Sequence, residues 1–297
     1  MSFLTSIVQG GLLGGYYAIV ACGLSFMFGV MKIINLAHGV LTILAAFALW
    51  AIADKLEYDP FLALIVVLPA MGGLGWLLQR AILERSARSG ELVPILSTFG
   101  LAIVLENTLF EQFGADTRSL APYVGSLSYD SVDLGAGVRI GKLAILTFVV
   151  AVLLLGGLQL FLNYTHLGRA IRATAEDPET VELVGVNSRS VNAIAAAIAL
   201  VTVGLAGLFL GLRTSFDPYA GSMQLIFAFE AAVIGGAGSL WGTLAGGIVL
   251  GIAQTLGAHL HPQGFLLAGH GAFLLVLMGR LYVSGPHFLF FRRAKLG

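Results

Sequence analysis

The sequence predicts an all-α protein, a polytopic membrane helix bundle with eight or nine crossings, one short broken segment and a cytoplasmic C-terminus. Of its 297 residues, 58% are hydrophobic and only 11% are charged, whereas soluble domains carry roughly 25% charged residues. Charge-free stretches of about 20 residues, the length that crosses about 30 Å of hydrocarbon, recur along the chain. The 39 glycines follow no Gly-X-Y period, which leaves closely packed membrane helices as their explanation.

The same composition excludes several function classes. Sixteen basic residues balance sixteen acidic ones, so no nucleic acid or acidic polymer is expected as a partner. Cys22 is the only cysteine, which rules out an internal disulfide, a CxxC redox motif and a cysteine metal cluster. We therefore expect no metal site and no cofactor in this chain, and the lipid bilayer as its surroundings.

Full-length spans follow from the charge-free stretches. The first span is not a cleaved secretory signal, because no basic residue precedes Lys32 and its apolar run exceeds the roughly 7–15 residues of a signal peptide. In chain order the spans lie at about 3–31, 36–53, 61–79, 92–113, 143–162, 191–212, 240–257 and 264–283.

The tract 222–257 is too long for one crossing, because a helix of that length would reach about 54 Å. Glycines interrupt it at 235–239. We therefore expect two elements, a short broken segment at about 222–235 and the span at 240–257.

The basic residues predict the orientation, because cytoplasmic connections are rich in Lys and Arg. With the N-terminus outside, eleven of the sixteen basic residues lie inside, on the connections 80–91 and 163–190, in the tail and at Lys32. This arrangement requires the segment 222–235 to carry the chain back to the inside, which gives nine passages. All of 1–297 is then a single transmembrane domain, with 163–190 as its longest cytoplasmic loop.

Two interruptions of the helical pattern, at 28–39 and 232–242, indicate a transport pathway, because broken segments at corresponding positions of two halves commonly hold the binding site. Tight turns between packed helices are the alternative. Ionisable and polar groups at membrane depth are functional candidates by default. The candidates for lining the pathway are Asn35, His38, Glu106, Asn107, Glu230 and Ser239.

These polar residues have two open readings. They line a hydrophilic pathway or contact a substrate ammonium group, or they hydrogen-bond backbone that broken helices leave exposed. For His38 the structural role is favoured. For Glu106 and Glu230 both stay open.

Small residues recur every fourth position at Gly238, Gly242 and Gly246. Gly10 with Gly14 repeats this spacing, as does the pair Gly247 and Gly251. Such a row leaves a groove in which a second helix approaches closely. Packing within the chain is favoured over a subunit interface.

Enzyme motifs are absent from the sequence. It contains no HExxH, no Gly-x-Ser-x-Gly and no paired intramembrane aspartates. A phosphate-binding P-loop is also missing. If nucleotide drives this protein, another chain binds it.

The connection 163–190 has the most local structure. Residues 167–175 form a basic, helix-favouring stretch, and Asp177, Pro178 and Glu179 supply an N-cap, a first-turn proline and a first-turn acid. Gly185 is placed to end that second helix. We expect two short amphipathic helices whose apolar residues seat in a groove of a soluble partner; the alternative is a helix lying on lipid headgroups, which Arg169 and Arg172 favour. The apolar residues concerned are Ile171, Val181, Leu183 and Val184.

Residues 168–179 followed by 185–187 resemble the coupling loop of permease subunits of the branched-chain amino acid ABC importer family. The stretches 29–39 and 231–247 resemble two further signatures of that family. Trp241 departs from the common pattern, in which a smaller residue or proline is frequent. The resemblance covers nearly the whole chain, and the length is similar to the shorter of the two paired permeases.

The resemblance implies an inner-membrane permease that works with a second related permease, two cytoplasmic ATP-binding subunits that carry ATP and Mg, and an extracytoplasmic solute-binding protein. Its cargo would be branched-chain or other hydrophobic amino acids, although family members also carry urea, short-chain amides and small carboxylates. The implied contacts to the ATPase are Gly168, Arg169, Arg172, Glu176, Asp177, Pro178, Glu179 and Gly185. The competing hypothesis is a self-sufficient secondary transporter or channel, in which Glu106 and Glu230 would couple protons or cations.

Overall fold

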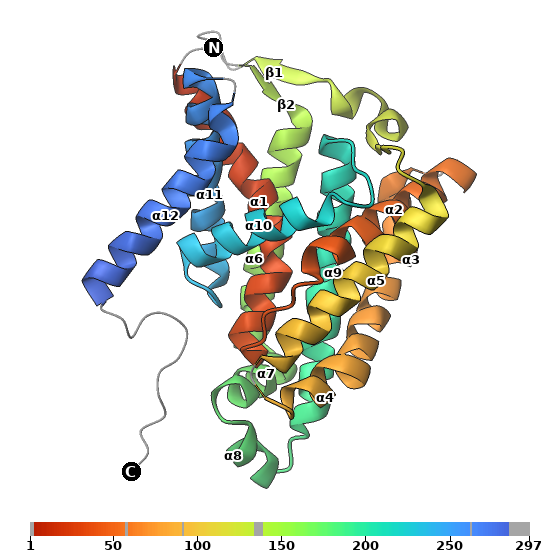
Figure 1. Cartoon of the computed structure of the whole chain (residues 1–297), viewed down its shortest axis with the longest axis vertical. Helices are drawn as coiled ribbons and strands as arrows, with labels where there is room; N and C mark the ends of the chain where they lie inside the picture. The colour runs from red at the N-terminus through yellow and green to blue at the C-terminus, as the bar shows by residue number, and fades with distance from the viewer. Residues whose placement is uncertain (1–2, 57–58, 91, 134–138, 262, 285–297) are drawn as a thin grey trace.

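The computed structural model describes residues 3–56, 59–90, 92–133, 139–261 and 263–284, and their arrangement is a helix bundle (Figure 1). Within these ranges, eight helices are long and apolar enough to cross a membrane, which confirms the predicted polytopic bundle. Its long helices are α1 (Phe3–Met31), α2 (His38–Leu56), α3 (Pro60–Leu78), α5 (Val93–Phe113), α6 (Lys142–Tyr164), α9 (Ser188–Arg213), α11 (Leu240–Leu260) and α12 (Gly264–Ser284).

Short elements join these helices at the two ends of the bundle. A π turn, η1 (Gln79–Leu83), leads from α3 into α4 (Glu84–Ala87). The antiparallel pair β1 (Ser131–Asp133) and β2 (Arg139–Gly141) follows the 3-10 helix η2 (Ala121–Ser128). At the opposite end lie α7 (His166–Glu176) and α8 (Pro178–Leu183). We call the end that carries α7 and α8 the inner end, and the end that carries the strands the outer end.

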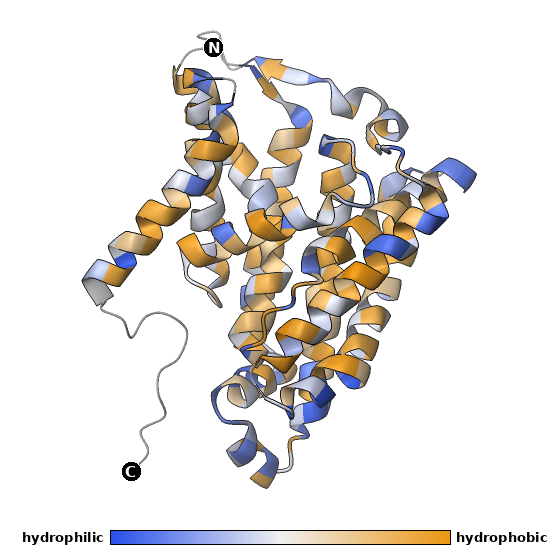
Figure 2. Cartoon of the chain, viewed as in Figure 1, coloured by the Kyte–Doolittle hydropathy of each residue, from blue (hydrophilic) through white to orange (hydrophobic). Residues whose placement is uncertain are grey.

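Hydropathy follows this division. Orange, hydrophobic residues cover the length of the bundle, and blue, hydrophilic residues gather mainly toward its two ends (Figure 2). Large apolar side chains are exposed on α3, α5, α6 and α12. In water such faces would be costly, whereas hydrocarbon solvates them.

α1 is the centre of the core and packs antiparallel to α11 through two pairs of glycines. A Cβ atom on Gly14 would lie 2.4 Å from the Ile248 Cα, and one on Gly247 would lie 2.5 Å from the Gly14 carbonyl oxygen. Gly10 and Gly251 meet in the same way one turn further along, where a Cβ atom on Gly251 would lie 2.3 Å from the Gly10 carbonyl oxygen. The four-residue spacings of Gly10 with Gly14 and of Gly247 with Gly251 therefore belong to the two sides of one helix contact.

The first interruption is a non-helical segment at residues 32–37 between α1 and α2. Side chains accept two of its backbone N–H groups: the Ala37 N–H donates to Asn35 Oδ1 over 3.0 Å, and the Leu36 N–H donates to Thr98 Oγ1 on α5 over 3.1 Å. Broken backbone at membrane depth needs such partners, because hydrocarbon supplies none.

The second interruption separates α10 (Gly221–Gly235) from α11. α10 has 15 residues and is about 22 Å long, too short to cross about 30 Å of hydrocarbon. Figure 1 shows it lying across the bundle near mid-height. The helix alone therefore does not make the return to the inner side that the sequence predicts. The turn at 236–239 continues the path in that direction, and Gly238 packs there against Gly29 near the inner end of α1.

Candidate functional site

Glu230 lies on α10 with only 3% of its surface exposed. Its Oε1 atom is 2.5 Å from the Nδ1 atom of His270 on α12. Its Oε2 atom is buried and has no hydrogen-bond partner among the described residues. A carboxyl group at membrane depth is thus paired on one oxygen and buried without a partner on the other.

His270 was not among the residues predicted from the sequence. Its side chain is 40% exposed although it lies within the span α12. Its position as an ionisable residue inside the apolar stretch 264–283 could have marked it as a candidate. What the sequence did not show is that α12 passes α10 at Glu230.

Asn35 and His38 are buried in the core. His38 Nε2 donates to the Val20 carbonyl oxygen over 2.7 Å, and its Nδ1 atom has no partner in the described part of the chain. Asn35 accepts the Ala37 N–H and, through its carbonyl oxygen, the His38 N–H. The His38 side chain thus holds the first interruption against α1, and the Asn35 side chain accepts a backbone N–H within it. A structural role of this kind was favoured from the sequence for His38 and left open for Asn35.

Glu106 and Asn107 lie on α5, whose outward surface is mostly apolar. Asn107 is exposed and donates to the Ile103 carbonyl oxygen over 2.8 Å, whereas Glu106 is half-buried. A shallow surface cavity of about 490 Å³ includes Asn107 but not Glu106; its lining residues are Ile103, Val104, Asn107, Thr108, Glu111 and Gln112. The two neighbours in sequence thus have different surroundings.

Ser239 caps the start of α11, where its Oγ atom accepts the Gly242 N–H over 3.1 Å. Gly238 precedes the helix, with a left-handed φ of 89°, and its N–H donates to Ser25 Oγ over 3.2 Å. Gly242 and Gly246 face α10: a Cβ atom on Gly246 would lie 2.1 Å from the Ala231 carbonyl oxygen. The row of small residues thus supports both the turn and the α10–α11 contact.

Arg280 on α12 binds the end of α10. Its Nη1 atom donates to the Val233 carbonyl oxygen over 3.0 Å, and its Nη2 atom donates to that of Ile234 over 2.6 Å. The sequence placed Arg280 only among the basic groups that flank the spans. A guanidinium at a helix C-terminus satisfies carbonyl groups that have no intrahelical donor.

The two helices predicted in 163–190 are present as α7 and α8. α7 is held against the bundle, because a Cβ atom on Gly168 would lie 2.3 Å from the Phe161 carbonyl oxygen of α6 and because Ile171 is fully buried. Arg169 and Arg172 are exposed, and Arg169 Nη1 donates to the Tyr164 carbonyl oxygen over 3.4 Å.

α8 begins at Pro178 behind the N-cap Asp177, whose Oδ1 atom accepts the N–H groups of Glu179 and Thr180 over 3.1 Å each. Hydrogen bonds from the Thr180 hydroxyl and N–H hold the pKa of the Asp177 carboxyl below its ordinary value. Glu176 and Glu179 are exposed beside it. After α8, Gly185 adopts a φ of 86°.

The apolar residues of this loop divide into two sets. Leu183 and Val184 are 86% and 76% exposed, whereas Ile171 and Val181 are buried against the rest of the chain. The expectation that all four enter a partner's groove is therefore wrong for Ile171 and Val181, which anchor the loop. An exposed apolar tip bordered by acidic residues remains.

Comparison with known proteins gives a consistent result. Residues 6–279 match the family described as branched-chain amino acid transport system, permease component. The high-affinity branched-chain amino acid transport system permease protein BraD of Pseudomonas aeruginosa is 30% identical over 293 residues, which cover 94% of each chain. LivH of Escherichia coli K12, described in the same words, is 29% identical over 93% of each chain. The fructose import permease protein FrcC of Rhizobium meliloti is 28% identical over 74% of this chain and 61% of its own length.

Proposed function

Because the chain belongs to the family of branched-chain amino acid transport system permease components, we propose that it forms part of the membrane pathway of an ATP-driven importer for small aliphatic amino acids. Family membership makes it a transport subunit rather than an enzyme, located in the bacterial inner membrane as a multi-pass protein. Its relatives are components of importer systems with ATP-binding and solute-binding partners.

Branched-chain amino acids are the proposed cargo. The relatives that align with 93–94% of this chain are described as permeases for these amino acids. The fructose permease aligns with a smaller share of each chain, so it supports the family but not a sugar as cargo. A urea, amide or small carboxylate importer stays the alternative within the family.

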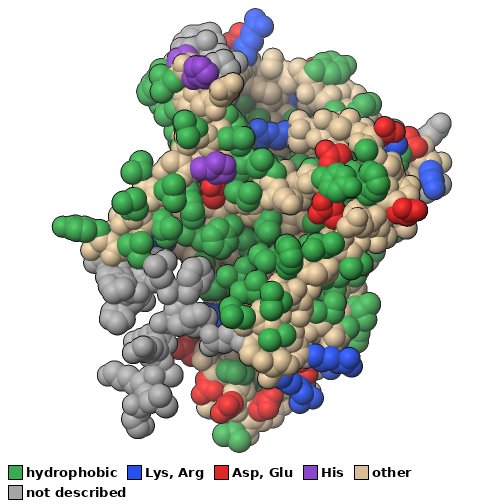
Figure 3. Space-filling view, in the orientation of Figure 1, with side chains coloured by type: hydrophobic (Ala, Val, Ile, Leu, Met, Phe, Trp, Pro, Cys, Tyr) green, Lys and Arg blue, Asp and Glu red, His purple; other side chains and the backbone are tan. Residues whose placement is uncertain are grey.

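The finer assembly is also a proposal: one second related permease, two ATP-binding subunits at the inner end and one solute-binding protein at the outer end. In the view of Figure 3 a broad hydrophobic area lies over the middle of the molecule between the charged ends. Polar groups on such a face are costly against lipid. We place the second permease over α5, α10 and α12, where Asn107, Glu230 and His270 would then face a protein-lined pathway.

The main observation behind this proposal is the short helix α10, which ends within the membrane before α11 begins and which contains Glu230. Interrupted helices at mid-membrane form substrate sites in transporters. The Oε2 atom of Glu230 is buried and has no partner among the described residues, so it would accept a hydrogen bond from a substrate ammonium group in a state of the pathway that exposes it. Ser239 at the following turn would lie along the same route, whereas we assign Asn35, His38 and Glu106 to structural or peripheral positions.

Coupling to ATP would pass through α7 and α8. Leu183 and Val184 would enter a groove of an ATP-binding subunit, and the exposed Glu176, Asp177 and Glu179 would meet basic residues at its rim. Because α7 packs on α1, α6 and α9, a movement of this tip would reach the bundle.

The test is reconstitution in liposomes. The chain with its partner permease, ATP-binding subunits and binding protein should take up leucine only when ATP is present on the ATPase side. The chain alone should give no gradient-driven uptake. Substantial uptake by the chain alone, at any imposed proton or sodium gradient, would replace the importer with a secondary transporter.

A further inference from the structure

A cavity of about 380 Å³ opens at the outer end of the bundle, between α1, α6, α9 and α11 and beside β2. This is within the range of roughly 300–1,000 Å³ typical of small-molecule sites. Its lining contributes polar groups (Gln9, Tyr16, Ser128, Thr147, Arg213 and Thr255) and apolar ones (Leu12, Leu13, Ile140, Leu143, Leu212 and Phe265, among others). A ligand with one polar and one aliphatic end would match this lining.

Arg213, the last residue of α9, is the cation of this cavity. Its guanidinium carbon lies 5.1 Å from the centre of the Tyr16 ring. No carboxylate of the described residues lies within 4.0 Å of its nitrogens. Three other cations at the outer end do have acidic partners: Arg118 pairs with Asp116, Arg139 with Asp133, and Lys142 with Asp130.

The hydroxyl groups of the lining have already used their donors, and the neutral Gln9 amide gives one of its two hydrogens to the Arg139 carbonyl oxygen over 3.4 Å. Thr147 and Thr255 donate their hydroxyl hydrogens to backbone carbonyls of α6 and of α1 or α11, and Ser128 donates to the Gly125 carbonyl oxygen. The Tyr16 hydroxyl donates to Gln224 Oε1 over 2.5 Å. The guanidinium is therefore the strong donor group left for a ligand, and it forms two parallel bonds with a carboxylate.

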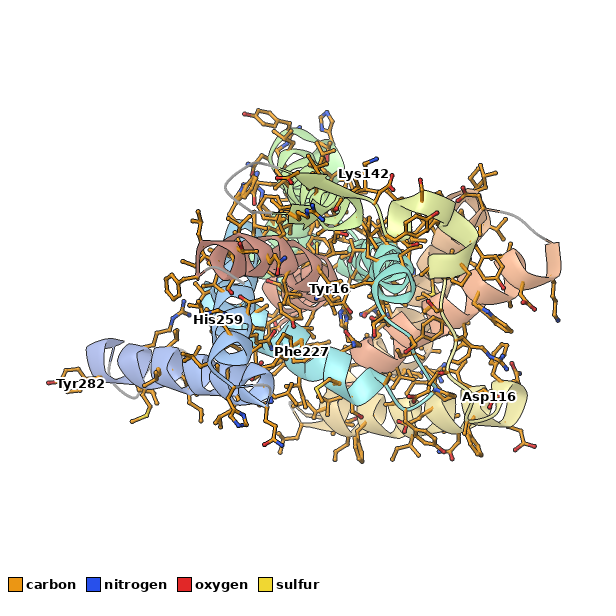
Figure 4. The ribbon with its side chains drawn as sticks, turned by 90° about the horizontal axis from the view of Figure 1, so that it is seen from above. Tyr16, Asp116, Lys142, Phe227, His259 and Tyr282 are labelled. Atoms are coloured by element: carbon orange, nitrogen blue, oxygen red, sulfur yellow. The ribbon has the colours of Figure 1, made fainter. Side chains whose placement is uncertain are left out.

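The lining residue Tyr16 connects the cavity to the contact between α1 and the broken helix α10. Tyr16 makes this contact through Gln224, and the neighbouring Tyr17 packs on Phe227 with ring centres 5.1 Å apart. Seen from above, Tyr16 lies between Lys142 at the start of α6 and Phe227 of α10 (Figure 4). A ligand on Arg213 would thus be connected through Tyr16 and Gln224 to the helix that carries Glu230.

We propose that this cavity is an outer binding site for the carboxylate end of a small aliphatic amino acid, with Arg213 holding the carboxylate and the leucines of α1, α6 and α9 contacting the side chain. The site rests on the proposed import function and adds an entry position at the outer end of the bundle. Its specificity would be for carboxylate over the neutral amide. Arg213→Lys would retain part of the binding, because an ammonium group is a point charge without the paired donor geometry.

The test uses the complete transporter in liposomes and photo-leucine, a diazirine analogue of leucine. After illumination, mass spectrometry should find the label on cavity peptides, such as those containing Leu12, Leu143 or Leu212. Excess leucine should remove the label, whereas the same concentration of leucinamide should not. Arg213→Gln should reduce labelling roughly 10-fold or more, the loss expected of a charge-assisted hydrogen bond. Lys55→Gln, an exposed cation at the same end, is the matched control and should leave it unchanged.

Several results would overturn the site. Labelling that leucinamide competes as well as leucine removes the role of the carboxylate, and competition by short-chain phosphatidylglycerol alone identifies a lipid headgroup site. If Arg213→Gln keeps its label but needs more binding protein for half-maximal ATPase activity, Arg213 serves docking of that protein. Leucine uptake by the wild-type transporter distinguishes failure of the proposed site from failure of the proposed import function. ATP-dependent uptake without labelling of the cavity would overturn the site only. Absence of ATP-dependent uptake would overturn the import function.

Discussion

Replacement of Gly14 by alanine should separate α1 from α11. The added Cβ atom would lie 2.4 Å from the Ile248 Cα, whereas carbon atoms in contact lie about 3.5–4.0 Å apart. The two backbones would thus have to move apart by about 1 Å, and overpacking of this kind costs about 1–3 kcal/mol. Gly11→Ala is the matched control on the same helix, because a Cβ atom there meets nothing within 4 Å.

The assay can use Cys22, which is fully buried on α1 and is the chain's only cysteine. A dye that fluoresces on reaction with a thiol reports thermal unfolding of detergent-solubilised protein. Gly14→Ala should lower the midpoint by several degrees relative to wild type, and Gly11→Ala should leave it unchanged or raise it. Equal midpoints for the two variants would refute the close contact between α1 and α11.

Three further predictions concern the coupling loop and the buried pair. Leu183→Ala should reduce leucine transport several-fold while the ATP-binding subunits keep hydrolysing ATP. The control Leu260→Ala, equally exposed at the outer end, should transport normally. Normal transport by Leu183→Ala would contradict the proposed contact of Leu183 with the ATP-binding subunit. Glu230→Gln and His270→Ala should not be additive in transport or thermal stability, because each removes the same 2.5 Å contact; additive losses would show that the contact contributes nothing. The pKa of Asp177 is lowered in the folded chain, so its cap stabilises α8 above the ordinary aspartate pKa and is lost as the pH falls through the lower, folded value. A spin label at Leu183→Cys should therefore keep its mobility from pH 7 down to about 5 and gain mobility only in more acidic solution; mobility that rises already near pH 6 would contradict the cap.

The long helices could be predicted from the sequence because each depends on its own residues. The expected span 92–113 is α5, Val93–Phe113, and the expected break after Gly235 is the end of α10. The start of α8 could be predicted too, because Asp177 and Pro178 specify a helix start locally. The length of an apolar stretch and the residues at its ends are sufficient for such predictions.

Contacts between distant segments could not be predicted in this way. Glu230 was a candidate, but its partner His270 depends on the path of α12 past α10. From the sequence, Arg280 was only a basic residue at the end of a span. Its acceptors are two backbone carbonyl groups of α10, and no residue type marks a backbone acceptor. For Val181, burial depends on how α7 is held against α6 and α9, which no pattern within the loop contains.

The packing of α1 has a consequence for the synthesis of the chain. The side chains of Tyr16, Tyr17 and Ser25 bond to Gln224, Gln254 and Thr243, which belong to α10 or α11 and follow α1 by roughly 200 residues. At about 5–20 residues per second, a ribosome needs about 10–40 s to deliver them. During that interval α1 is in the bilayer with uncovered glycines and unpaired tyrosine hydroxyls. α1 thus reaches its final surroundings only after α10 and α11 have been made.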